Sequence, residues 1–517
     1  MKINIIGAGI SGLTAGCYLQ MNGFETQIFE KHSIPGGLCT SWKKGEYTFD
    51  GCIHWILGSN KGSSFYKMWS ELLHMESIPF HHHDARIHVE LKKNKDKYGS
   101  SVFHVFNNLD RLQEYMTDLA PEDEKIIRGF VKNIRIIQQL DLPPVMDKLP
   151  LIPSMIRSIK MTKYLRFLFL FLRLNKETTH TLAKKFKNPF LREGIETIFD
   201  GQEVKLLIFS FPTAVFDLKS AGYPIGGSLS WAKRLANRYT ELGGKIHYNT
   251  PVKNILTESN KATGLLVRNN VIHNSDIVVS AADWNHTVFD FLDGKFVDKK
   301  MLDLKEGKKL DLFYSAMMVS FGINKSYEGY PHFSRFPIKG TLTSPCGTTW
   351  DRLEVHIYNY DPTLAPKGKT VITCCFFTRC GEYWINLRKK ERKKYREEKA
   401  KFCNDVLDFL DQKLPGTKEA VEEIDFGTPA TFERYTHNWQ GSTQGWLPEN
   451  NLLAKSPVGY TLPSLANFYY ASHWSQPGGG LPIAINKGRD VTKLICKNTK
   501  REFKVIKPKE SPDFATS

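Results

Sequence analysis

Long apolar stretches are missing from this chain of 517 residues. No run reaches the roughly 18 consecutive apolar residues that a membrane-spanning helix needs, so we expect no transmembrane segment. The nine cysteines are odd in number, and they show neither zinc-binding spacing nor a CxxC pair. We therefore expect reduced thiols that are mostly buried, as is usual for a cytosolic protein.

Catalytic sets built from side chains alone are missing as well. We find no Ser-His-Asp set, no pair of carboxylates and no nucleic-acid-binding module. Three consecutive histidines, His81, His82 and His83, stand beside a predicted β region. Neighbouring residues of a strand point to opposite faces, so these three make a poor single metal site, and we expect no metal.

Positive charge is what the chain has in excess. Lys and Arg number 71 and Asp and Glu 54, so the formal net charge is 71 − 54 = +17. Such an excess points to an anionic partner, which can be a membrane surface, a nucleic acid or an acidic substrate. Without a nucleic-acid-binding module, an anionic membrane surface is the leading expectation, together with a cytoplasmic and peripheral location. The length exceeds what one core supports, so two or more domains are expected.

The start of the chain carries a dinucleotide-binding pattern. A short apolar run over 2–6 predicts a buried parallel strand. Gly7, Gly9 and Gly12 follow as GxGxxG at the start of a helix, and Glu30 ends a second strand 30 − 12 = 18 residues later. Such glycines allow a tight turn, a close approach of the backbone to a pyrophosphate and close packing of helix and strand. An acid near this spacing accepts the ribose hydroxyls of the nucleotide.

A second glycine motif indicates which dinucleotide to expect. The tripeptide Pro-Gly-Gly at 35–37 follows the acid, and simple nicotinamide enzymes need no glycine pair there. The stretches GGLCTSW (36–42) and YTFDGCIHW (47–55) resemble the phytoene desaturase, carotenoid isomerase and retinol saturase family of FAD-dependent oxidoreductases. Amine oxidases belong to the same large group, but they usually have Arg directly after the glycine pair, and this chain has Leu38.

Two later blocks match this family in order and spacing. Over 221–290 a glycine pair precedes a helix, strands and a hairpin follow, and a buried parallel strand over 277–280 leads into Ala-Ala-Asp. The block 430–494 contains the loop PGGGLP (477–482) before a closing helix over 483–494. The N–H groups at the start of that helix can point at the carbonyl end of a flavin.

The resemblance implies FAD as the cofactor and an enzyme that desaturates, saturates or isomerises carbon–carbon double bonds of a lipophilic polyene or isoprenoid. His54 and His473 are our only candidates for protein groups beside the flavin ring, and we expect them to position rather than to react. The cofactor-binding residues that we expect are Gly7, Gly9, Ile10, Ser11, Gly12, Glu30, Lys31, Gly36, Gly37, Leu38, Val252, Gly479, Gly480, Leu481 and Pro482.

The expected fold class is α/β, with a discontinuous Rossmann-like domain that has a parallel sheet and a mixed α+β substrate domain that has an antiparallel sheet. The predicted ranges are 1–75, 216–300 and 430–497 for the FAD-binding domain, 76–215 and 301–429 for the substrate-binding domain, and 498–517 for a flexible tail. Residues 387–414 are predicted as one long helix, because an apolar face follows a charged run.

One predicted helix suits a membrane surface. Every residue from Phe167 to Leu172 is Phe or Leu, and ten Lys and Arg stand against one Glu over 148–187, a local net charge of 10 − 1 = +9. Aromatic and Leu side chains beside Lys and Arg are typical of an interfacial helix, so 148–187 is the candidate membrane contact. A buried core helix with a charged outer face is the alternative.

Two other functions stay open at this point. A flavin amine oxidase shares the cofactor motifs, and a non-catalytic prenyl-protein escort shares the fold. Leu38 and the basic Phe/Leu helix favour the polyene enzyme over the amine oxidase. The complete set of glycines and Glu30 argues against the escort.

Overall fold

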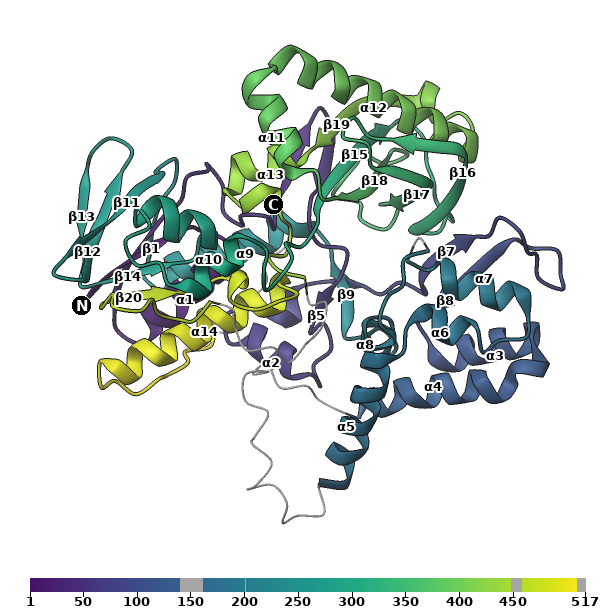
Figure 1. The fold of residues 1–517 in the computed structure, drawn as a ribbon, viewed down its shortest axis with the longest axis horizontal. Coiled ribbons are helices and arrows are strands. Elements are labelled where there is room, and N and C mark those ends of the chain that lie inside the picture. The colour runs from purple at the N-terminus through teal and green to yellow at the C-terminus, as the bar shows by residue number, and fades with distance from the viewer. Residues whose placement is uncertain (140–160, 200, 448–457, 509–517) are drawn as a thin grey trace.

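A computed structural model describes residues 1–139, 161–199, 201–447 and 458–508 (Figure 1). The strands are β1 (Lys2–Ile6), β2 (Glu25–Phe29), β3 (Ser41–Lys44), β4 (Tyr47–Asp50), β5 (Ile56–Leu57), β6 (Phe80–His81), β7 (Ala85–Glu90), β8 (Val102–Phe106), β9 (Ala221–Pro224), β10 (Lys245–His247), β11 (Val252–Glu258), β12 (Lys261–Val267), β13 (Ile272–Asn274), β14 (Ile277–Ser280), β15 (Ser315–Ile323), β16 (Phe333–Thr343), β17 (Thr349–Ile357), β18 (Thr370–Thr378), β19 (Val421–Gly427) and β20 (Phe468–Tyr470). The α-helices are α1 (Ile10–Met21), α2 (Ser64–Ser70), α3 (Leu109–Leu119), α4 (Glu124–Gln138), α5 (Met161–Lys176), α6 (Thr179–Ala183), α7 (Pro189–Thr197), α8 (Leu206–Asp217), α9 (Gly227–Glu241), α10 (Lys299–Lys305), α11 (Gly381–Lys390), α12 (Arg392–Lys413), α13 (Pro429–Thr436) and α14 (Gly480–Asn498).

A five-stranded parallel sheet joins the two ends of the chain. Its order is β10-β2-β1-β14-β20, and every neighbouring pair is parallel. The central strands β1 and β14 are almost wholly buried, which explains their apolar sequences. Because β20 comes from residues 468–470, the parallel sheet is assembled from distant segments, as the predicted Rossmann-like fold requires.

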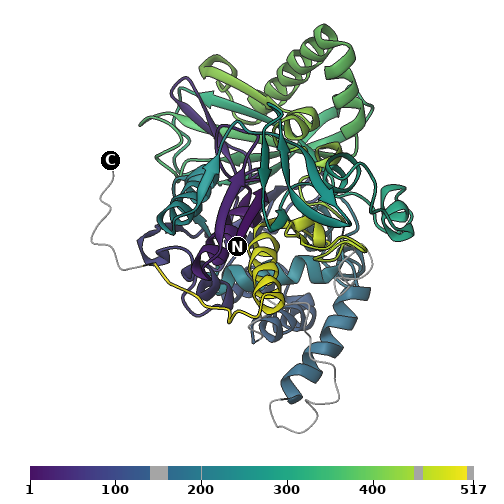
Figure 2. The ribbon, with the colours of Figure 1, turned by 90° about the vertical axis from the view of Figure 1, so that its left-hand side faces the viewer.

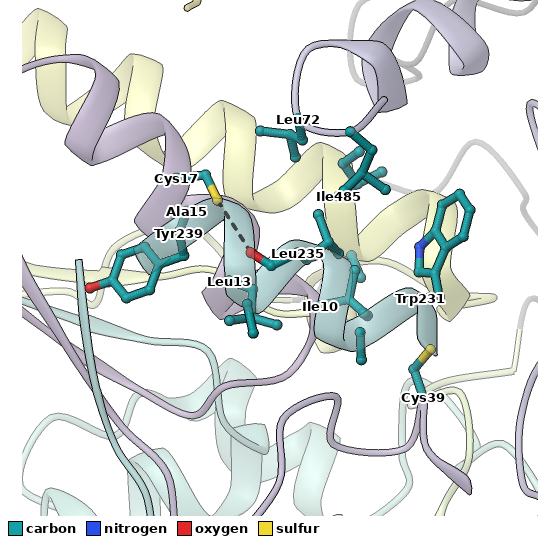
Figure 3. Packing of buried hydrophobic residues seen from close by; sticks show 14 of the residues in the cluster. Ile10, Leu13, Ala15, Cys17, Cys39, Leu72, Trp231, Leu235, Tyr239 and Ile485 are labelled. Carbon is teal, nitrogen blue, oxygen red and sulfur yellow. Dashed lines mark hydrogen bonds between the residues drawn. The ribbon is translucent and has the colours of Figure 1, made fainter. Parts of the chain in front are cut away.

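Helices α1, α9 and α14 pack together around one apolar core beside this sheet. Leu13 of α1, Leu235 of α9 and Ile485 of α14 belong to this core (Figure 3). The other face of the sheet is covered by the antiparallel sheet β11-β12-β13, whose Leu265 packs in one cluster with Val278. The nucleotide-binding unit is therefore a three-layer arrangement.

A second sheet, with seven strands, lies outside the nucleotide-binding unit. Its order is β19-β15-β18-β17-β16-β7-β8, antiparallel except for the parallel pair β16 and β7. Helix α12 covers one face of this sheet, where Phe402, Val406 and Leu410 join the buried cluster. The helices α3 to α8 gather around β7 and β8 in a further cluster, and α5 extends away from the body in both views (Figure 1, Figure 2). The predicted α/β fold class with parallel and antiparallel sheets is confirmed.

The single long helix predicted over 387–414 is wrong. The structure has two helices, α11 and α12, and they meet at Glu391, whose φ of −131° and ψ of 60° are not helical. Helix α11 packs on α13, whereas α12 packs on the seven-stranded sheet. The chain therefore turns at Glu391, so that one helix packs on α13 and the other packs on the sheet. The closing helix also differs from its prediction, because α14 begins at Gly480 and ends at Asn498.

The predicted flexible tail over 498–517 is wrong for the part up to residue 508. The guanidinium of Arg501 donates to the carbonyl oxygens of Asn22 and Gly23 at 3.0 and 2.8 Å. Phe503 packs against Tyr18, with ring centroids 5.7 Å apart. These contacts hold the segment along the end of α1, and residues 509–517 lie outside the described part of the chain.

Two of the cysteines depart from the expectation of reduced thiols. Cys346 and Cys380 form a disulfide between the β16–β17 turn and the start of α11. Six of the other cysteines are buried and free, and Cys52 is half-buried. The spacing of the pair, 34 residues apart, gave no sequence signal, because the fold alone brings the two thiols together. Over the described ranges, no helix is long and apolar enough to cross a membrane.

The packing of α14 on α1 yields a stability prediction. A methyl group on Gly488 would lie 2.7 Å from the carbonyl oxygen of Ser11 and 2.8 Å from the amide nitrogen of Ala15, so Gly488→Ala forces the helices apart. Overpacking of this kind costs about 1–3 kcal/mol. The matched control is Gly129→Ala in α4, which meets nothing within 4 Å. The control should stabilise by up to about 1 kcal/mol, because alanine favours helix. Urea unfolding of both variants checks this, and equal stability of the two would contradict the packing.

Candidate functional site

A cleft opens at the carboxyl ends of the parallel strands, where open α/β sheets bind their ligands. The loops after β1, β2, β14 and β20 form one side of the cleft, and β15, β18 and α13 form the other. The predicted residues that line it are Gly7, Gly9, Ile10, Ser11, Glu30, Lys31, Gly36, Gly37, Leu38, His54, Val252, His473, Gly480 and Leu481. Gly12, Gly479 and Pro482 were predicted too but do not line the cleft, and their contacts in the structure are described below.

The first glycine loop connects β1 to α1. Gly7 has a φ of +94°, which favours glycine, and a methyl group on Gly12 would lie 2.0 Å from the carbonyl oxygen of Gly7. Gly12 thus provides close packing between helix and loop. Gly9 is the N-cap of α1, and a methyl group on it would meet nothing within 4 Å. Because glycine has no side chain to cap the helix, the N–H groups of the first turn stay available, as a phosphate site requires.

Glu30 borders the cleft and also holds the loop in place. One carboxylate oxygen accepts a hydrogen bond from the amide of Ala8 at 2.7 Å, and the other accepts from the amide of His32 at 2.8 Å. Only 6% of Glu30 is exposed, and burial raises its pKa. Contact between Glu30 and a ribose stays a prediction. Its hydrogen bonds to the backbone are a structural task that spacing did not reveal.

The second glycine loop crosses the first one. The amide of Gly36 donates to the carbonyl of Ala8 at 2.8 Å, and Gly36 has a φ of +114°. A methyl group on Gly36 would lie 2.1 Å from the carbonyl oxygen of Cys39. Only glycine fits this turn. The crossing places Gly37 and Leu38 on the wall of the cleft.

The wall opposite the glycine loops is apolar. Met318 of β15, Cys375 of β18 and Phe432 of α13 form a buried cluster with Ala316, and Leu38 packs against this cluster. All five residues line the cleft. Sequence reasoning identified Leu38 but missed the other four, because strand pairing and the packing of α13 bring them together and no local motif marks them.

The third glycine loop leads into α14. Gly479, the N-cap of α14, has a φ of +44°, and a methyl group on it would lie 2.2 Å from the carbonyl oxygen of Gln444. Gly479 therefore packs against a neighbouring loop, while Gly480 and Leu481 face the cleft. Pro482 stands in the first turn of α14, where the missing N–H of proline is tolerated. Both α1 and α14 thus start at the cleft without a side-chain cap.

The two candidate histidines both face the cleft in neutral form. Burial, with a smaller effect of His356, lowers the pKa of His54 to about 3. Burial lowers the pKa of His473 to about 4, although Asp283 opposes the shift. The Nε2 atom of His473 is buried and has no hydrogen-bond partner within the described ranges. A ligand in the cleft can supply that partner.

Asp283 is a cleft residue that the sequence motifs did not single out. One of its oxygens accepts from the amide of His286 at 2.8 Å, and the other accepts from the amide of Trp439 at 2.8 Å. The carboxylate is buried and paired, so it orders the loop after β14. Its position after a buried parallel strand was the available signal, because such strand ends line the ligand crevice.

A group of buried and half-buried imidazoles extends from His54 toward the seven-stranded sheet. His54 stacks on His356 with ring centroids 4.3 Å apart, and His83 stacks on His332 at 3.4 Å. Burial is the largest cause that lowers the pKa of His83, to about 3. Burial also lowers the pKa of His332. Glu354 is held near His356, at 3.4 Å. Across the described part of the chain, no group of three or more His, Cys, Asp or Glu is arranged to hold a metal ion.

These histidines predict how stability depends on pH. The folded-state pKa values are about 3 for His54 and His83 and about 4 for His88 and His473, against an ordinary value of 6.5. As the pH falls below 6.5, these imidazoles take up protons in the unfolded chain but stay neutral in the folded chain. The free energy of unfolding therefore falls. Each group contributes up to about 1.4 kcal/mol per pH unit. Asp50, Glu30 and Asp425 act in the opposite sense, because burial raises the pKa of each, to about 6 for Asp50, but histidines with a lowered pKa outnumber them.

Urea unfolding between about pH 7 and about pH 5 measures this slope. His83→Phe should reduce the loss of stability on acidification by about 1 kcal/mol per pH unit, because the unfolded variant has one imidazole fewer to protonate. His74→Phe, which removes an exposed imidazole, is the matched control and should keep the wild-type slope. A slope in His83→Phe equal to that of the wild type would mean that His83 is not held neutral.

Comparisons with known proteins agree with this geometry. Residues 5–72 match the family described as an NAD(P)-binding Rossmann-like domain. The chain is similar to a chloroplastic prolycopene isomerase of an Oncidium hybrid cultivar, with 25% identity covering 92% of this chain and 80% of that protein. A 4,4'-diapophytoene desaturase of Methylomonas is 22% identical over 98% of this chain and 97% of its own. An all-trans-retinol 13,14-reductase of Danio rerio is 21% identical over 85% of this chain and 77% of its own.

Solved structures share the fold. An oxidoreductase from Methanosarcina mazei superposes with a TM-score of 0.56 at 17% identity, covering 96% of this chain and all of that one (100%). A putrescine oxidase reaches a TM-score of 0.56 at 12% identity, covering 96% of this chain and 99% of its own. At these identities the likeness shows the fold alone.

The resemblance to the phytoene desaturase, carotenoid isomerase and retinol saturase family is confirmed by these relatives. Their names describe isomerases, reductases and desaturases of carotenoids and of retinol. Relatives of this kind favour neither the amine oxidase nor the prenyl-protein escort. The comparisons do not test which residues contact a cofactor or where the domain boundaries lie, so those remain predictions.

Proposed function

We propose that this protein is an FAD-dependent oxidoreductase that acts on a carbon–carbon double bond of a long apolar polyene or isoprenoid. The substrate resembles a carotenoid or a retinoid. The observation that carries the proposal is the apolar wall of Ala316, Met318, Cys375 and Phe432, which faces the glycine loops across the cleft. The names of the relatives support the same substrate class.

The residues of the cleft suit FAD. The two uncapped helix starts, at Gly9 of α1 and Gly479 of α14, offer backbone N–H groups to the phosphates and to the carbonyl end of a flavin. Glu30 stands where the ribose hydroxyls are expected, and Val252 lines the same cleft. When bound, FAD supplies the oxidation and reduction chemistry, while the protein binds, orients and shields.

Lys31 closes the same end of the cleft as Glu30. Its ammonium donates to the carbonyl oxygen of Arg434 at 2.7 Å, and burial lowers its pKa to about 8. This contact ties the loop after β2 to the end of α13. Lys31 therefore lies beside Glu30 at the end of the cleft that we assign to the nucleotide, and we assign it no part in the reaction.

The substrate is held by contacts with the apolar wall. Burying each CH₂ group contributes about 0.8 kcal/mol, so a long chain needs no charged anchor. His54 and His473 are neutral at physiological pH, because burial lowers the pKa of each. Neutral imidazoles can donate or accept a single hydrogen bond at the cofactor without placing a charge beside an apolar substrate. Their task in this proposal is to position.

Anaerobic mixing tests the reaction. Candidate polyenes should reduce the oxidised flavin or reoxidise the reduced flavin, and an isomerase would give product without net flavin turnover. Met318→Glu should lower kcat/KM for the polyene at least tenfold, because an unpaired charge on the apolar wall costs several kcal/mol. Met318→Leu, of similar volume, should stay within about threefold of the wild type. If polyenes give no signal and primary amines bleach the flavin, the protein is an amine oxidase.

Helix α5 supports a peripheral membrane contact as part of the proposal. Leu170 and Leu174 are buried in the helical cluster, whereas Leu168, Phe169 and Leu172 on the other face are exposed, Phe169 by 71%. The exposed face of α5 over 168–176 thus carries apolar side chains beside Arg173, whereas the alternative of a core helix has only charges on its outer face. Residues 148–160 of the candidate contact lie outside the described residues. We propose reversible binding to anionic membranes at the cytoplasmic side, which lets an apolar substrate enter from the bilayer.

Vesicle co-sedimentation tests this contact. The wild type should bind anionic vesicles at low salt and release as salt rises, because each basic residue near the surface contributes about 1 kcal/mol. The double variant Phe169→Ser with Leu172→Ser should lose most of this binding. The control Ile272→Ser with Leu302→Ser removes two exposed apolar side chains elsewhere and should bind as the wild type does. If the wild type ignores anionic vesicles at low salt, the exposed face of α5 serves another purpose.

A further inference from the structure

A second cavity lies behind the nucleotide-binding unit and shares no lining residue with the cleft. It is open to solvent on one side and is lined by the outer face of α9, the β3–β4 hairpin, the segment 72–78, Thr363, Leu364 and Pro508, and its volume is about 670 Å³. Helix α9 separates it from the glycine loops, because a methyl group on Gly36 would lie 2.9 Å from the Cβ of Ala232. Nothing in the proposed reaction uses this cavity.

The sequence of α9 gives the helix two distinct faces. Trp231, Leu235 and Tyr239 recur at helical spacing and point into the core. Lys233 and Arg234 stand on the opposite face and line the cavity, as do Asn237 and Arg238 one turn later. A helix rises about 5.4 Å per turn, so Lys233, Arg234 and, one turn later, Arg238 form a short basic stripe along the cavity wall.

The stripe carries charge that neighbouring acids do not balance. Lys43, Lys233, Arg234 and Arg238 line the cavity against the single acid Glu241, a local net charge of 4 − 1 = +3. Arg238 is engaged, since it lies 3.6 Å from Glu241 and donates to the carbonyl oxygen of Ile506 at 2.7 Å. Within the described ranges, no acid lies within ion-pair distance of Lys43, Lys233 or Arg234.

The pKa of Arg234 also reflects the lack of a neighbouring acid. It is half-buried, and burial lowers its pKa from the ordinary value. No acidic neighbour offsets this shift. A partly buried guanidinium without a counter-charge is an unfavourable arrangement that a bound anion would relieve.

The cavity also has an apolar part, beside polar lining residues such as Ser41, Ser77 and Thr363. Leu72, Leu73 and Ile78 contribute from the segment after α2, and Leu229 of α9 and Leu364 add to them. Trp42 of β3 lines the cavity as well and is half-buried. An apolar surface beside a cationic stripe matches a ligand that has an anionic head and an apolar body.

We propose that this cavity binds a phosphorylated amphiphile, with the phosphate against Lys233 and Arg234 and the apolar part against the leucines and Trp42. A phosphate carries up to two negative charges at neutral pH, which suits a site with three unbalanced cations better than a single carboxylate does. The guanidinium of Arg234 can hold two phosphate oxygens at once, and the ammonium of Lys233 adds a point charge. The phosphate can belong to a soluble compound or to a lipid headgroup.

Isothermal titration calorimetry of the full-length protein tests the proposal. The probes are n-octyl phosphate below its micelle concentration, inorganic phosphate and n-octanol. Octyl phosphate should bind at least tenfold more tightly than either fragment, because only it uses both parts of the lining. Lys233→Gln with Arg234→Gln should weaken octyl phosphate at least tenfold. Neither side chain packs in the core, so the fold and the thermal unfolding temperature should be kept.

The matched control is Lys261→Gln with Lys299→Gln, which removes the same charge from exposed positions that do not line the cavity. It should bind octyl phosphate as the wild type does. Equal binding by the stripe variant, absence of heat with octyl phosphate, or equal affinity for octanol would each overturn the proposal. Vesicles containing phosphatidic acid, tested with Phe169→Ser and Leu172→Ser in place, identify the source of the phosphate. Binding that depends on Lys233 and Arg234 indicates a lipid headgroup, and its absence beside tight octyl phosphate binding indicates a soluble ligand.

Discussion

Close approach of backbone to backbone at three glycine loops is the constraint on which this structure depends. A methyl group on Gly12, Gly36 or Gly479 would lie 2.0, 2.1 or 2.2 Å from the carbonyl oxygen of Gly7, Cys39 or Gln444, respectively. At such distances no side chain fits without displacing the backbone. The first two loops cross near the start of the chain, and the packing of α14 on α1 at Gly488 brings both helix starts to one cleft.

Neutral groups dominate the part of the cleft away from Glu30 and Lys31. His54 and His473 stay uncharged because burial lowers the pKa of each, and Asp283 is occupied by two backbone amides. A charged and unpaired group beside the apolar wall would cost several kcal/mol. In our proposal the end of the cleft at Glu30 and Lys31 binds the nucleotide and the apolar wall holds the substrate, an arrangement that favours a hydrocarbon over an amine.

Much of the nucleotide-binding unit could be predicted, because its signals are local. The spacing of Gly7, Gly9 and Gly12 between a strand and a helix depends on one turn, and the glycine pair at 36–37 on another. The same is true of the buried strand β14, whose apolar sequence shows that both faces are covered. In each case neighbouring residues in the sequence are also neighbours in space.

The rest could not be predicted, because it depends on tertiary packing. The apolar wall joins Met318, Cys375 and Phe432, which no short pattern connects. The turn at Glu391 and the disulfide between Cys346 and Cys380 arise where surfaces meet that are distant in sequence. Arg501 and Phe503 likewise reverse the expectation of a frayed tail, through contacts with α1 that composition does not show.

The basic stripe on α9 shows the same difference between pattern and packing. In the sequence, Lys233, Arg234 and Arg238 look like the solvent-exposed face of an ordinary amphipathic helix. The β3–β4 hairpin and the segment 72–78 turn that face into the wall of a cavity. The fold thus creates a second site from residues that carry no motif.

The most direct test of the central claim is to denature the purified protein and identify what it releases. Our account predicts a yellow protein that releases FAD in a ratio near one per chain, without a covalent link. Glu30→Ala should then weaken FAD about tenfold to a hundredfold, since a hydrogen bond to a charged group contributes roughly 1.5–3 kcal/mol. Release of a nicotinamide dinucleotide, or a protein that stays colourless after incubation with FAD, would contradict the account.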